Sequence, residues 1–115
     1  MPVVIKVVNL EAGLPTVEQA RAQLTTELAN ARREEVRLLK IIHGYGSTGV
    51  GGALRDGLLG SLGRMKMRGE IRNFVAGEDW RVADETTWGL LKRFPKLKSD
   101  SDLGRGNRGI TVVVL

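Results

Sequence analysis

The sequence predicts an α/β fold: a two-layer sandwich in which a four-stranded mixed sheet carries two helices on one face. Two observations lead to this prediction. Short apolar runs rich in β-branched residues alternate along the chain with longer segments whose apolar residues recur at helical spacing. Strands that alternate with helices are joined by right-handed crossovers, which make neighbouring strands parallel and stack the helices on the sheet. The predicted order is βαβαβ, an insert, and a last β-strand.

The first strand and the first helix are predicted near the N-terminus. Residues 3–8, "VVIKVV", are short and almost entirely β-branched, which favours a buried strand over a helix. Thr16 and Gln19 form a T-x-x-Q capping box, in which each side chain accepts a hydrogen bond from the backbone N–H of the other residue. An apolar stripe at helical spacing follows the cap: Val17, Ala20, Leu24, Leu28 and Ala31.

The remaining strands and the second helix follow the same pattern. Residues 36–42, "VRLLKII", predict a second strand that leads directly into a glycine-rich stretch. A second helix is predicted from Gly52 or Ala53. Its buried face is marked by Leu54, Leu58, Leu62 and Met65. Residues 70–77 predict a third strand, and residues 110–115, "ITVVVL", predict a fourth, which we expect to pair as an antiparallel edge strand.

Residues 77–109 are expected to form a flexible basic insert. A short helix is predicted at 83–94, where Asp84 is placed to cap it. The rest of the insert is polar and contains glycine, which is typical of a mobile loop. Its cations fit either a nucleic-acid-binding arm or a solvated loop, and Asp100 and Asp102 dilute their charge. These cations are Lys92, Arg93, Lys96, Lys98, Arg105 and Arg108.

Composition restricts the class of protein. A length of 115 residues is typical of one domain, so residues 1–115 are assigned to a single domain. The 18 basic and 13 acidic side chains give a net charge of +5, which favours polyanionic partners such as DNA or RNA. The absence of cysteine excludes a disulfide scaffold and any thiolate metal site. With a single histidine no metal site is predicted, although a role for a divalent metal ion is left open.

The sequence also bears on location. The N-terminal residues lack the basic region and the cleavage site of a signal peptide, and no apolar run is long enough to span a bilayer. We therefore expect a cytoplasmic protein without a membrane partner. The sequence does not determine the oligomeric state.

The most distinctive stretch is "IIHGYGSTGVGG", residues 41–52, which contains the G-x-G-x-x-G pattern of dinucleotide-binding proteins. Its position argues against that function, because the pattern follows the second predicted strand rather than the first. The acidic residue that binds a ribose about 20 residues further on is also not at the end of the next strand. A P-loop is excluded because no Gly-Lys-Ser or Gly-Lys-Thr occurs. No nucleotide cofactor is expected.

The same stretch predicts an anion site. Backbone N–H groups at a helix N-terminus attract phosphate with the help of the helix dipole, and glycines allow the backbone to approach it closely. Ser47 and Thr48 supply hydroxyl donors, Arg55 a bidentate contact, and Tyr45 a ring that can stack on a base. The alternative is a tight turn without a ligand. The predicted nucleic-acid-binding residues are Gly44, Tyr45, Gly46, Ser47, Thr48, Gly49, Gly51, Gly52 and Arg55.

An apolar strand that ends in His-Gly-x-Gly, a glycine loop and a helix that starts near Leu-Arg resembles the Smr (small MutS-related) domain family. Here these features are Ile41 and Ile42, His43 to Gly46, and Leu54 with Arg55. The similarity extends over residues 3–76 and 109–115. It implies a nucleic-acid-binding module, since some members nick DNA or cut RNA and others only bind. It also implies a fold similar to the C-terminal domain of bacterial translation initiation factor three.

The chain departs from the family pattern at the end of the first strand, where family nucleases usually carry Leu-Asp-x-His-Gly. Here the sequence is "VVNLEAGLP", and either Asn9 and Glu11, or Glu11 and Gly13, take the Asp and His positions. His43 is a candidate general acid or base, and Glu11 its candidate catalytic partner, but a structural His–Glu pair is an equal alternative. Endonuclease activity is therefore left open. The other possibility is a catalytically inactive binding or protein-interaction adaptor module.

Overall fold

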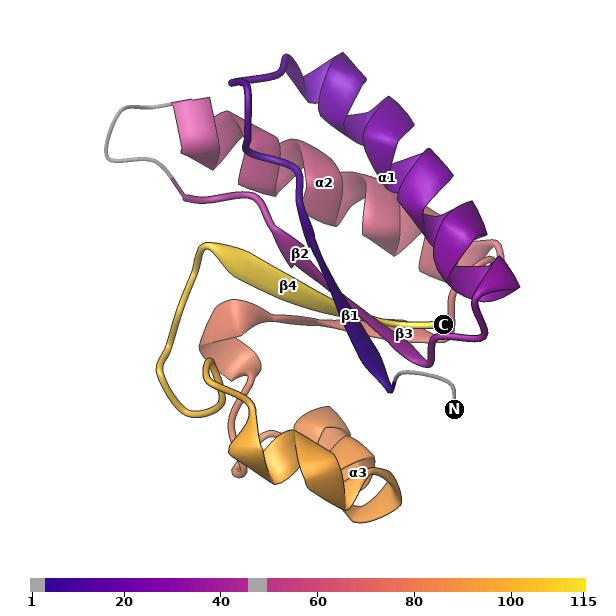
Figure 1. Ribbon diagram of the computed structural model, residues 1–115. Helices are drawn as coiled ribbons and strands as arrows, with labels where there is room; N and C mark the ends of the chain where they lie inside the picture. Colours follow the sequence, from indigo (N-terminus) through magenta and orange to yellow (C-terminus); the bar gives the residue numbers. More distant parts are fainter. Residues whose placement is uncertain (1–3, 46–49) are drawn as a thin grey trace.

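The computed structural model describes residues 4–45 and 50–115 as one four-stranded sheet with helices on both faces (Figure 1). The elements, in chain order, are β1 (Ile5–Asn9), α1 (Val17–Arg33), β2 (Leu38–Ile42), α2 (Val50–Met67), β3 (Asn73–Ala76), η1 (Gly77–Asp79), α3 (Glu85–Arg93), η2 (Pro95–Ser99) and β4 (Ile110–Val114). The strand order is β1-β2-β4-β3, with β1 parallel to β2 and β4 antiparallel to both of its neighbours. The predicted α/β class and four-stranded mixed sheet are confirmed.

The two predicted helices, α1 and α2, lie together on one face of the sheet, as expected (Figure 1). The capping box of α1 is formed: Thr16 Oγ1 accepts from Gln19 N at 3.1 Å, and Gln19 Oε1 accepts from Thr16 N at 2.9 Å. The predicted apolar stripes of both helices are buried in one core with β2 and β4. Its members include Leu24, Leu28, Leu54, Leu58, Leu62, Leu39, Ile41 and Val113.

The edge position expected for the last strand is wrong. β4 is antiparallel, but it lies between β2 and β3, with Ile42 opposite Ile110 and Ala76 opposite Thr111. All five of its residues are buried. Burial on both faces is the physical reason, because a run that is apolar except for Thr111 fits a central strand better than an edge strand, which keeps one side in contact with water.

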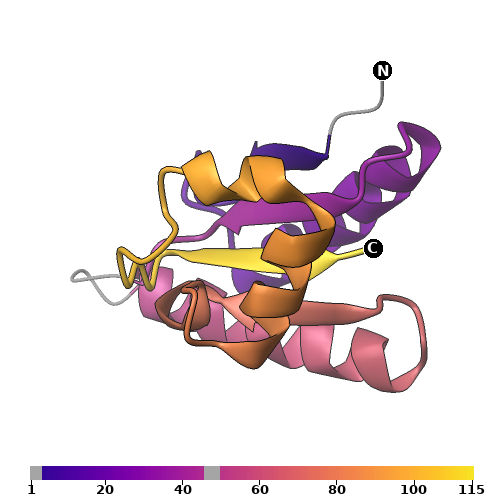
Figure 2. The same cartoon turned by 90° about the horizontal axis from the view of Figure 1, so that it is seen from below.

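Residues 77–109, expected to be a flexible insert, fold against the second face of the sheet (Figure 2). Asp84 caps α3 as predicted, accepting from Thr87 N at 2.9 Å. Apolar side chains of the segment pack against the sheet residues that point away from α1 and α2, and so form a second core. This core includes Trp80, Leu90, Leu91 and Leu97 of the segment, and Leu38, Val75 and Val112 of the sheet. The segment therefore adds a layer to the predicted sandwich.

A buried lysine ties this segment to the sheet. Lys40, in the middle of β2, is 3% exposed, and its Nζ lies 2.7 Å from Asp100 Oδ1 and 2.7 Å from Asp102 Oδ2. Asp100 Oδ2 also accepts from Trp80 Nε1 at 2.9 Å. Burial alone lowers the pKa of Lys40, but hydrogen bonds to the two carboxylates outweigh it and raise the pKa. Because the single positive charge of Lys40 neutralises only one of the two negative charges, Asp100 and Asp102 dilute the charge of the insert less than the sequence indicates.

Gly77 allows the segment to leave β3 close to the backbone that returns to β4. A Cβ atom added at Gly77 would lie 1.7 Å from Asn107 O and 2.8 Å from Ile110 O.

We expect Gly77→Ala to lower the free energy of unfolding by about 2 kcal/mol, because the backbone must shift to make room. Urea denaturation measures this change. Gly89→Ala, in α3 where nothing lies within 4 Å, is the control, and it should leave stability unchanged or raised by about 0.5 kcal/mol. Equal effects of the two substitutions would contradict the steric explanation.

Among residues 4–45 and 50–115, no helix combines the length and the apolar character needed to cross a membrane.

Candidate functional site

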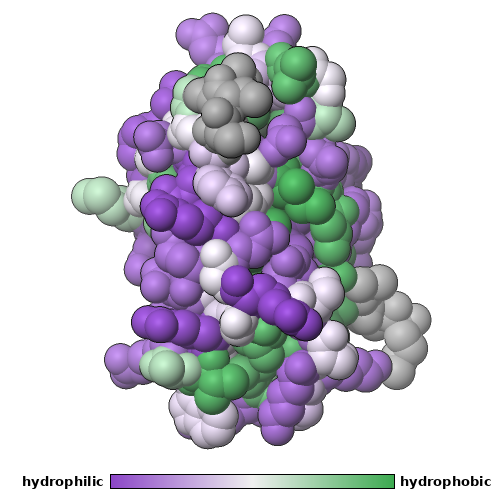
Figure 3. Space-filling view, turned by 90° about the vertical axis from the view of Figure 1, so that its left-hand side faces the viewer, coloured by the Kyte–Doolittle hydropathy of each residue, from purple (hydrophilic) through white to green (hydrophobic). Residues whose placement is uncertain are grey.

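The candidate site lies at the carboxyl end of β2, where the chain leads from His43 toward α2. Because β1 is parallel to β2, the segment that follows β1 lies at the same end, and Leu10 N donates to Ile42 O at 2.8 Å. The side chain of Asn9 turns this segment by accepting from Glu11 N at 2.9 Å and from Ala12 N at 3.0 Å. Figure 3 looks at this end of the molecule, whose surface is largely hydrophilic with an apolar strip on one side.

Gly44 brings the loop after β2 against Glu11. It adopts φ +71°, a backbone conformation that favours glycine, and a Cβ atom added here would lie 1.8 Å from Glu11 Oε2. The carboxylate of Glu11 therefore rests on the Cα of Gly44. The segments that follow β1 and β2 therefore lie side by side at these two residues.

The ring of His43 is fully buried, at 0% exposure. Its Nδ1 lies 2.6 Å from Gly44 O, and its Nε2 lies 2.8 Å from Thr111 Oγ1. Because a carbonyl oxygen only accepts, Nδ1 carries a hydrogen atom, and Nε2 of the neutral ring then accepts from the Thr111 hydroxyl. Both ring nitrogens thus have partners other than Glu11, which acts on the ring only through its charge.

The electrostatic environment keeps His43 neutral. Burial lowers the pKa of His43 most strongly, and the positive charge of Arg55 lowers it further. The carbonyl of Gly44 and the negative charges of Glu11 and Glu78 raise the pKa, but less than burial lowers it. A neutral, enclosed imidazole with both nitrogens bonded is well suited to hold the loop in place.

Arg55, predicted to contact phosphate, is held by a carboxylate from η1. Its side chain is 16% exposed, and Nη2 donates to Glu78 Oε2 at 2.5 Å. Burial raises the pKa of Glu78, but its own backbone N–H, Arg55 and Arg108 together lower the pKa below its ordinary value. Arg108 Nε lies 3.9 Å from the same Oε2 atom, and the Arg108 side chain is 60% exposed. Arg108 is therefore the more accessible cation of this cluster.

Tyr45 lies at the surface between α2 and the start of β4. It is 58% exposed. Tyr45 O is 3.5 Å from the Cβ position of Gly52, in the first turn of α2, and the Tyr45 ring is 3.6 Å from that of Gly109. His43 N and Gly44 N both donate to Gly109 O, at 2.9 and 3.0 Å. The structure thus brings together an exposed aromatic ring, the start of a helix and the residue next to Arg108.

The other predicted binding residues are placed only in part. Gly51 belongs to the first turn of α2. Gly46, Ser47, Thr48 and Gly49 lie outside the described residues. Within the described part of the chain, no group of three or more histidine, aspartate or glutamate side chains is arranged to hold a metal ion.

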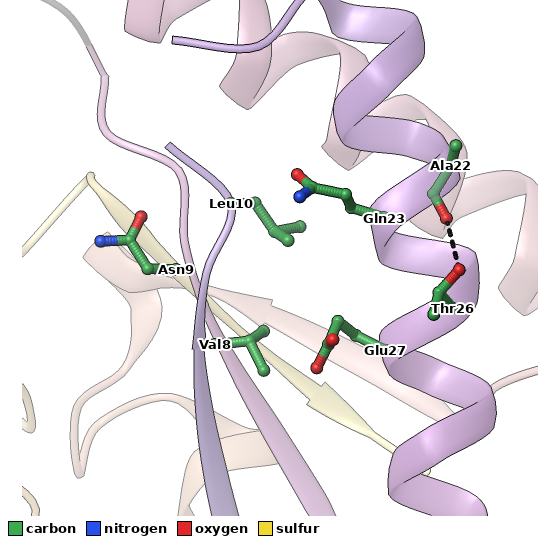
Figure 4. Close-up of a pocket in the computed structure, with 7 residues that line it drawn as sticks. All are labelled: Val8, Asn9, Leu10, Ala22, Gln23, Thr26 and Glu27. Carbon is green, nitrogen blue, oxygen red and sulfur yellow. Dashed lines mark hydrogen bonds between the residues drawn. The ribbon is translucent and has the colours of Figure 1, made fainter. Parts of the chain in front are cut away.

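A groove of about 480 Å³ lies elsewhere, between the edge strand β1 and helix α1 (Figure 4). It is lined by Val8, Asn9, Leu10, Ala22, Gln23, Thr26 and Glu27. It includes none of the residues predicted to bind nucleic acid, and Figure 4 shows Gln23 and Glu27 reaching from α1 toward β1 across it.

Two residues of the site were missed by the sequence prediction, Thr111 and Glu78, and Arg108 was named only as one of the cations of the insert. Thr111 carried a signal, because it is the one polar residue in the apolar run "ITVVVL". A polar side chain in a buried strand needs a hydrogen-bond partner, and His43 provides it. Glu78 carried no such signal, and no local pattern places Arg108 near it, because both positions depend on how residues 77–109 fold back to the sheet.

Comparisons with known proteins identify a matching family and a similar fold. The family model described as "Smr domain" matches residues 12–81, which is more than half of the chain. The fold is similar to the crystal structure of the Smr domain of Thermus thermophilus MutS2, with a TM-score of 0.59 and 25% sequence identity over 96% of each chain. No curated protein matches the chain. The His-Gly-x-Gly motif, the fold and the family match agree, and the chain belongs to the Smr domain family.

Proposed function

We propose that this Smr domain binds nucleic acid through the phosphate backbone, at the end of the sheet where Gly44, Tyr45, Arg55 and Arg108 lie. The observation that carries the proposal is the position of Tyr45, an exposed ring beside the first turn of α2 and next to Gly109. An aromatic side chain beside a cation and a helix N-terminus is the combination that single-strand binders use to stack a base and hold its phosphate.

The charge of the domain supports this proposal. The net charge is +5, and two of the acidic groups, Asp100 and Asp102, are paired with the buried Lys40. Lys40 compensates one of these two negative charges, so the basic side chains of residues 92–108 remain in excess. Such a surface attracts polyanions and makes their binding depend on salt concentration.

The environment of His43 supports binding rather than cleavage. A general acid or base must reach the reacting group, whereas this ring is buried and both of its nitrogens are bonded within the domain. We therefore assign His43 a positioning role: it links Gly44 to Thr111 and so fixes the start of the loop. Endonuclease activity is the alternative, and the experiments below separate the two.

The proposal is tested by fluorescence anisotropy with labelled single-stranded and duplex DNA and RNA over a range of salt concentrations, together with a cleavage assay on the same substrates. We expect affinity to fall steeply with salt and no cleavage. Tyr45→Ala should weaken single-strand binding by about 1 to 3 kcal/mol per stacked base. Trp88→Ala is the matched control, because Trp88 is also exposed, at 46%, but lies on α3. Absence of binding at low salt, or equal losses in both variants, would refute the proposal.

Glu11 provides a further test. Its carboxylate rests on Gly44, so it repels a phosphate bound by the loop. We expect Glu11→Gln to raise the affinity for nucleic acid by about threefold at low salt, with a smaller gain at high salt. Glu18→Gln, in the first turn of α1, is the control and should have little effect. If Glu11 were catalytic, Glu11→Gln would instead abolish a cleavage activity present in the wild type.

A further inference from the structure

Three arginines converge at the end of the sheet opposite His43. Arg37, Arg72 and Arg93 line a hollow of about 170 Å³ together with Phe94, Val114 and Leu115. In Figure 1 this end of the sheet is on the right, where the C-terminus is marked, and β2 runs from there toward the left, where His43 follows it. The hollow is therefore separate from the site described above.

Each arginine comes from a different part of the chain. Arg37 precedes β2 and is fixed by two backbone hydrogen bonds, from Arg37 N to Val4 O at 3.2 Å and from Leu115 N to Arg37 O at 3.1 Å. Arg72 precedes β3, and its N–H donates to Val114 O at 2.9 Å. Arg93 is the last residue of α3. The fold thus holds the three Cα positions around one hollow.

All three arginines are exposed, and none forms an ion pair or a side-chain hydrogen bond with any residue that the structure describes. Two of them share one aromatic ring: Arg37 Cζ and Arg93 Cζ lie 5.6 Å and 5.1 Å from the centre of Phe94. The ring holds two like charges near each other, which an anion between them would stabilise.

Helix electrostatics explain only part of this cluster. A cation in the last turn of a helix is favoured by the helix dipole, which accounts for Arg93. Arg37 and Arg72 stand before strands, where no such effect applies. A planar guanidinium binds phosphate through two parallel hydrogen bonds, so three of them around a hollow suit a phosphate group.

We infer that Arg37, Arg72 and Arg93 bind a backbone phosphate of the nucleic acid, as a second contact that rests on the function proposed above. Residues 94–108 connect the two ends of the molecule, crossing the second face of the sheet (Figure 2). This segment carries exposed Lys96, Lys98 and Arg105 along the way. These cations outnumber the acidic groups of the segment, one of whose charges Lys40 compensates, so the connecting surface allows a phosphate backbone to pass between the two contacts.

The separation of the two contacts sets a minimum length for the ligand. Arg37 and His43 are at the two ends of β2, and six residues at about 3.3 Å each place them about 20 Å apart. Along a duplex strand, with about 3.4 Å per nucleotide, this distance corresponds to roughly six nucleotides. An oligonucleotide much shorter than this reaches only one of the two contacts.

The test compares Arg37→Gln/Arg72→Gln/Arg93→Gln with Arg21→Gln/Arg33→Gln/Lys66→Gln, a control that removes three exposed charges from α1 and α2. For a 20-nucleotide ligand we expect the first variant to bind with about tenfold lower affinity. The slope of log K against the logarithm of the salt concentration should become less negative by about 1 to 2. The control should lose less than threefold. For a four-nucleotide ligand the two variants should bind equally. The variant Arg37→Lys/Arg72→Lys/Arg93→Lys keeps the three positive charges and should keep most of the slope of log K against log salt, which separates loss of charge from misfolding.

The outcomes separate this inference from the proposed function. Equal losses in the glutamine variant and its control would overturn the inference, while a defect of Tyr45→Ala in the same assays would leave the proposed function standing. A wild-type domain that binds no nucleic acid would overturn both. If the glutamine variant lost more affinity for the four-nucleotide ligand than its control does, the inferred distance between the two contacts would be wrong.

Discussion

Asp100→Ala is expected to lower the free energy of unfolding by about 3 kcal/mol, because it leaves a buried ammonium group short of a partner. The side chain of Lys40 is 4% exposed and that of Asp100 is 11% exposed, so water replaces little of the lost contact. Trp80 Nε1 loses its acceptor in the same variant. Because Asp102 still binds Lys40 at 2.7 Å, the loss stays at the low end of what breaking a buried ion pair costs.

Urea denaturation followed by circular dichroism measures this loss. The control is Glu85→Ala, which removes an exposed carboxylate from α3 and should change stability by no more than about 0.5 kcal/mol. The double variant Lys40→Met/Asp100→Leu should recover much of the loss, since apolar side chains of similar volume often replace a buried ion pair without penalty. A single variant as stable as the wild type would show that the Lys40 contacts do not hold residues 77–109 on the sheet.

This buried network also links stability to the proposed function. Residues 77–109 carry Arg93 at one end of the sheet and Arg108 at the other, and Lys40 fixes the middle of the segment through Asp100 and Asp102. Loosening the segment moves both cations relative to the sheet. Lys40 therefore sets where the positive charge of the segment lies.

The features that sequence predicted correctly are those determined by neighbouring residues. Thr16 and Gln19 are three positions apart, and their capping box depends only on the start of one helix. The strand at 36–42 and the cap at Asp84 are local in the same way. By contrast, the position of β4 between β2 and β3 results from a choice among pairings that local patterns do not distinguish.

The contacts that sequence missed join residues far apart in the chain. Lys40 stands in an apolar run, and its partners Asp100 and Asp102 are about 60 positions away in a stretch whose polarity is typical of a loop. Thr111 is 68 positions from His43. The resemblance to the Smr family identifies His43 and Gly44 as candidate site residues, but only the fold indicates which groups surround them.

His43→Ala is expected to lower the free energy of unfolding by about 3 kcal/mol at pH 7.5. The substitution removes a fully buried ring and leaves the Thr111 hydroxyl without its partner. This effect depends on pH, since burial lowers the pKa of His43 in the folded state. As the pH falls below about 6.5, the unfolded chain binds a proton that the folded chain does not, so the wild type loses stability.

The difference in unfolding free energy between wild type and His43→Ala should therefore shrink between pH 7.5 and pH 5.5. Carboxylates titrate equally in both proteins, so the difference isolates the histidine. Thr111→Val serves as the matched variant. It should lower the free energy of unfolding by about 1 to 2 kcal/mol, and its stability should keep the pH dependence of the wild type, because the ring is still present. A difference that stays constant or grows on acidification would show that the pKa of the folded His43 is not lowered.

The variants His43→Ala and Thr111→Val also show whether a loss of function at His43 reflects a positioning role or a catalytic one. If His43 positions the loop, Thr111→Val should weaken nucleic-acid binding in the same direction as His43→Ala, because both remove the bond that joins the loop to β4. If His43 were a catalytic residue, Thr111→Val would retain substantial cleavage while His43→Ala abolished it. Measuring both variants where each is fully folded separates the positioning role from chemistry, which the single substitution His43→Ala does not do.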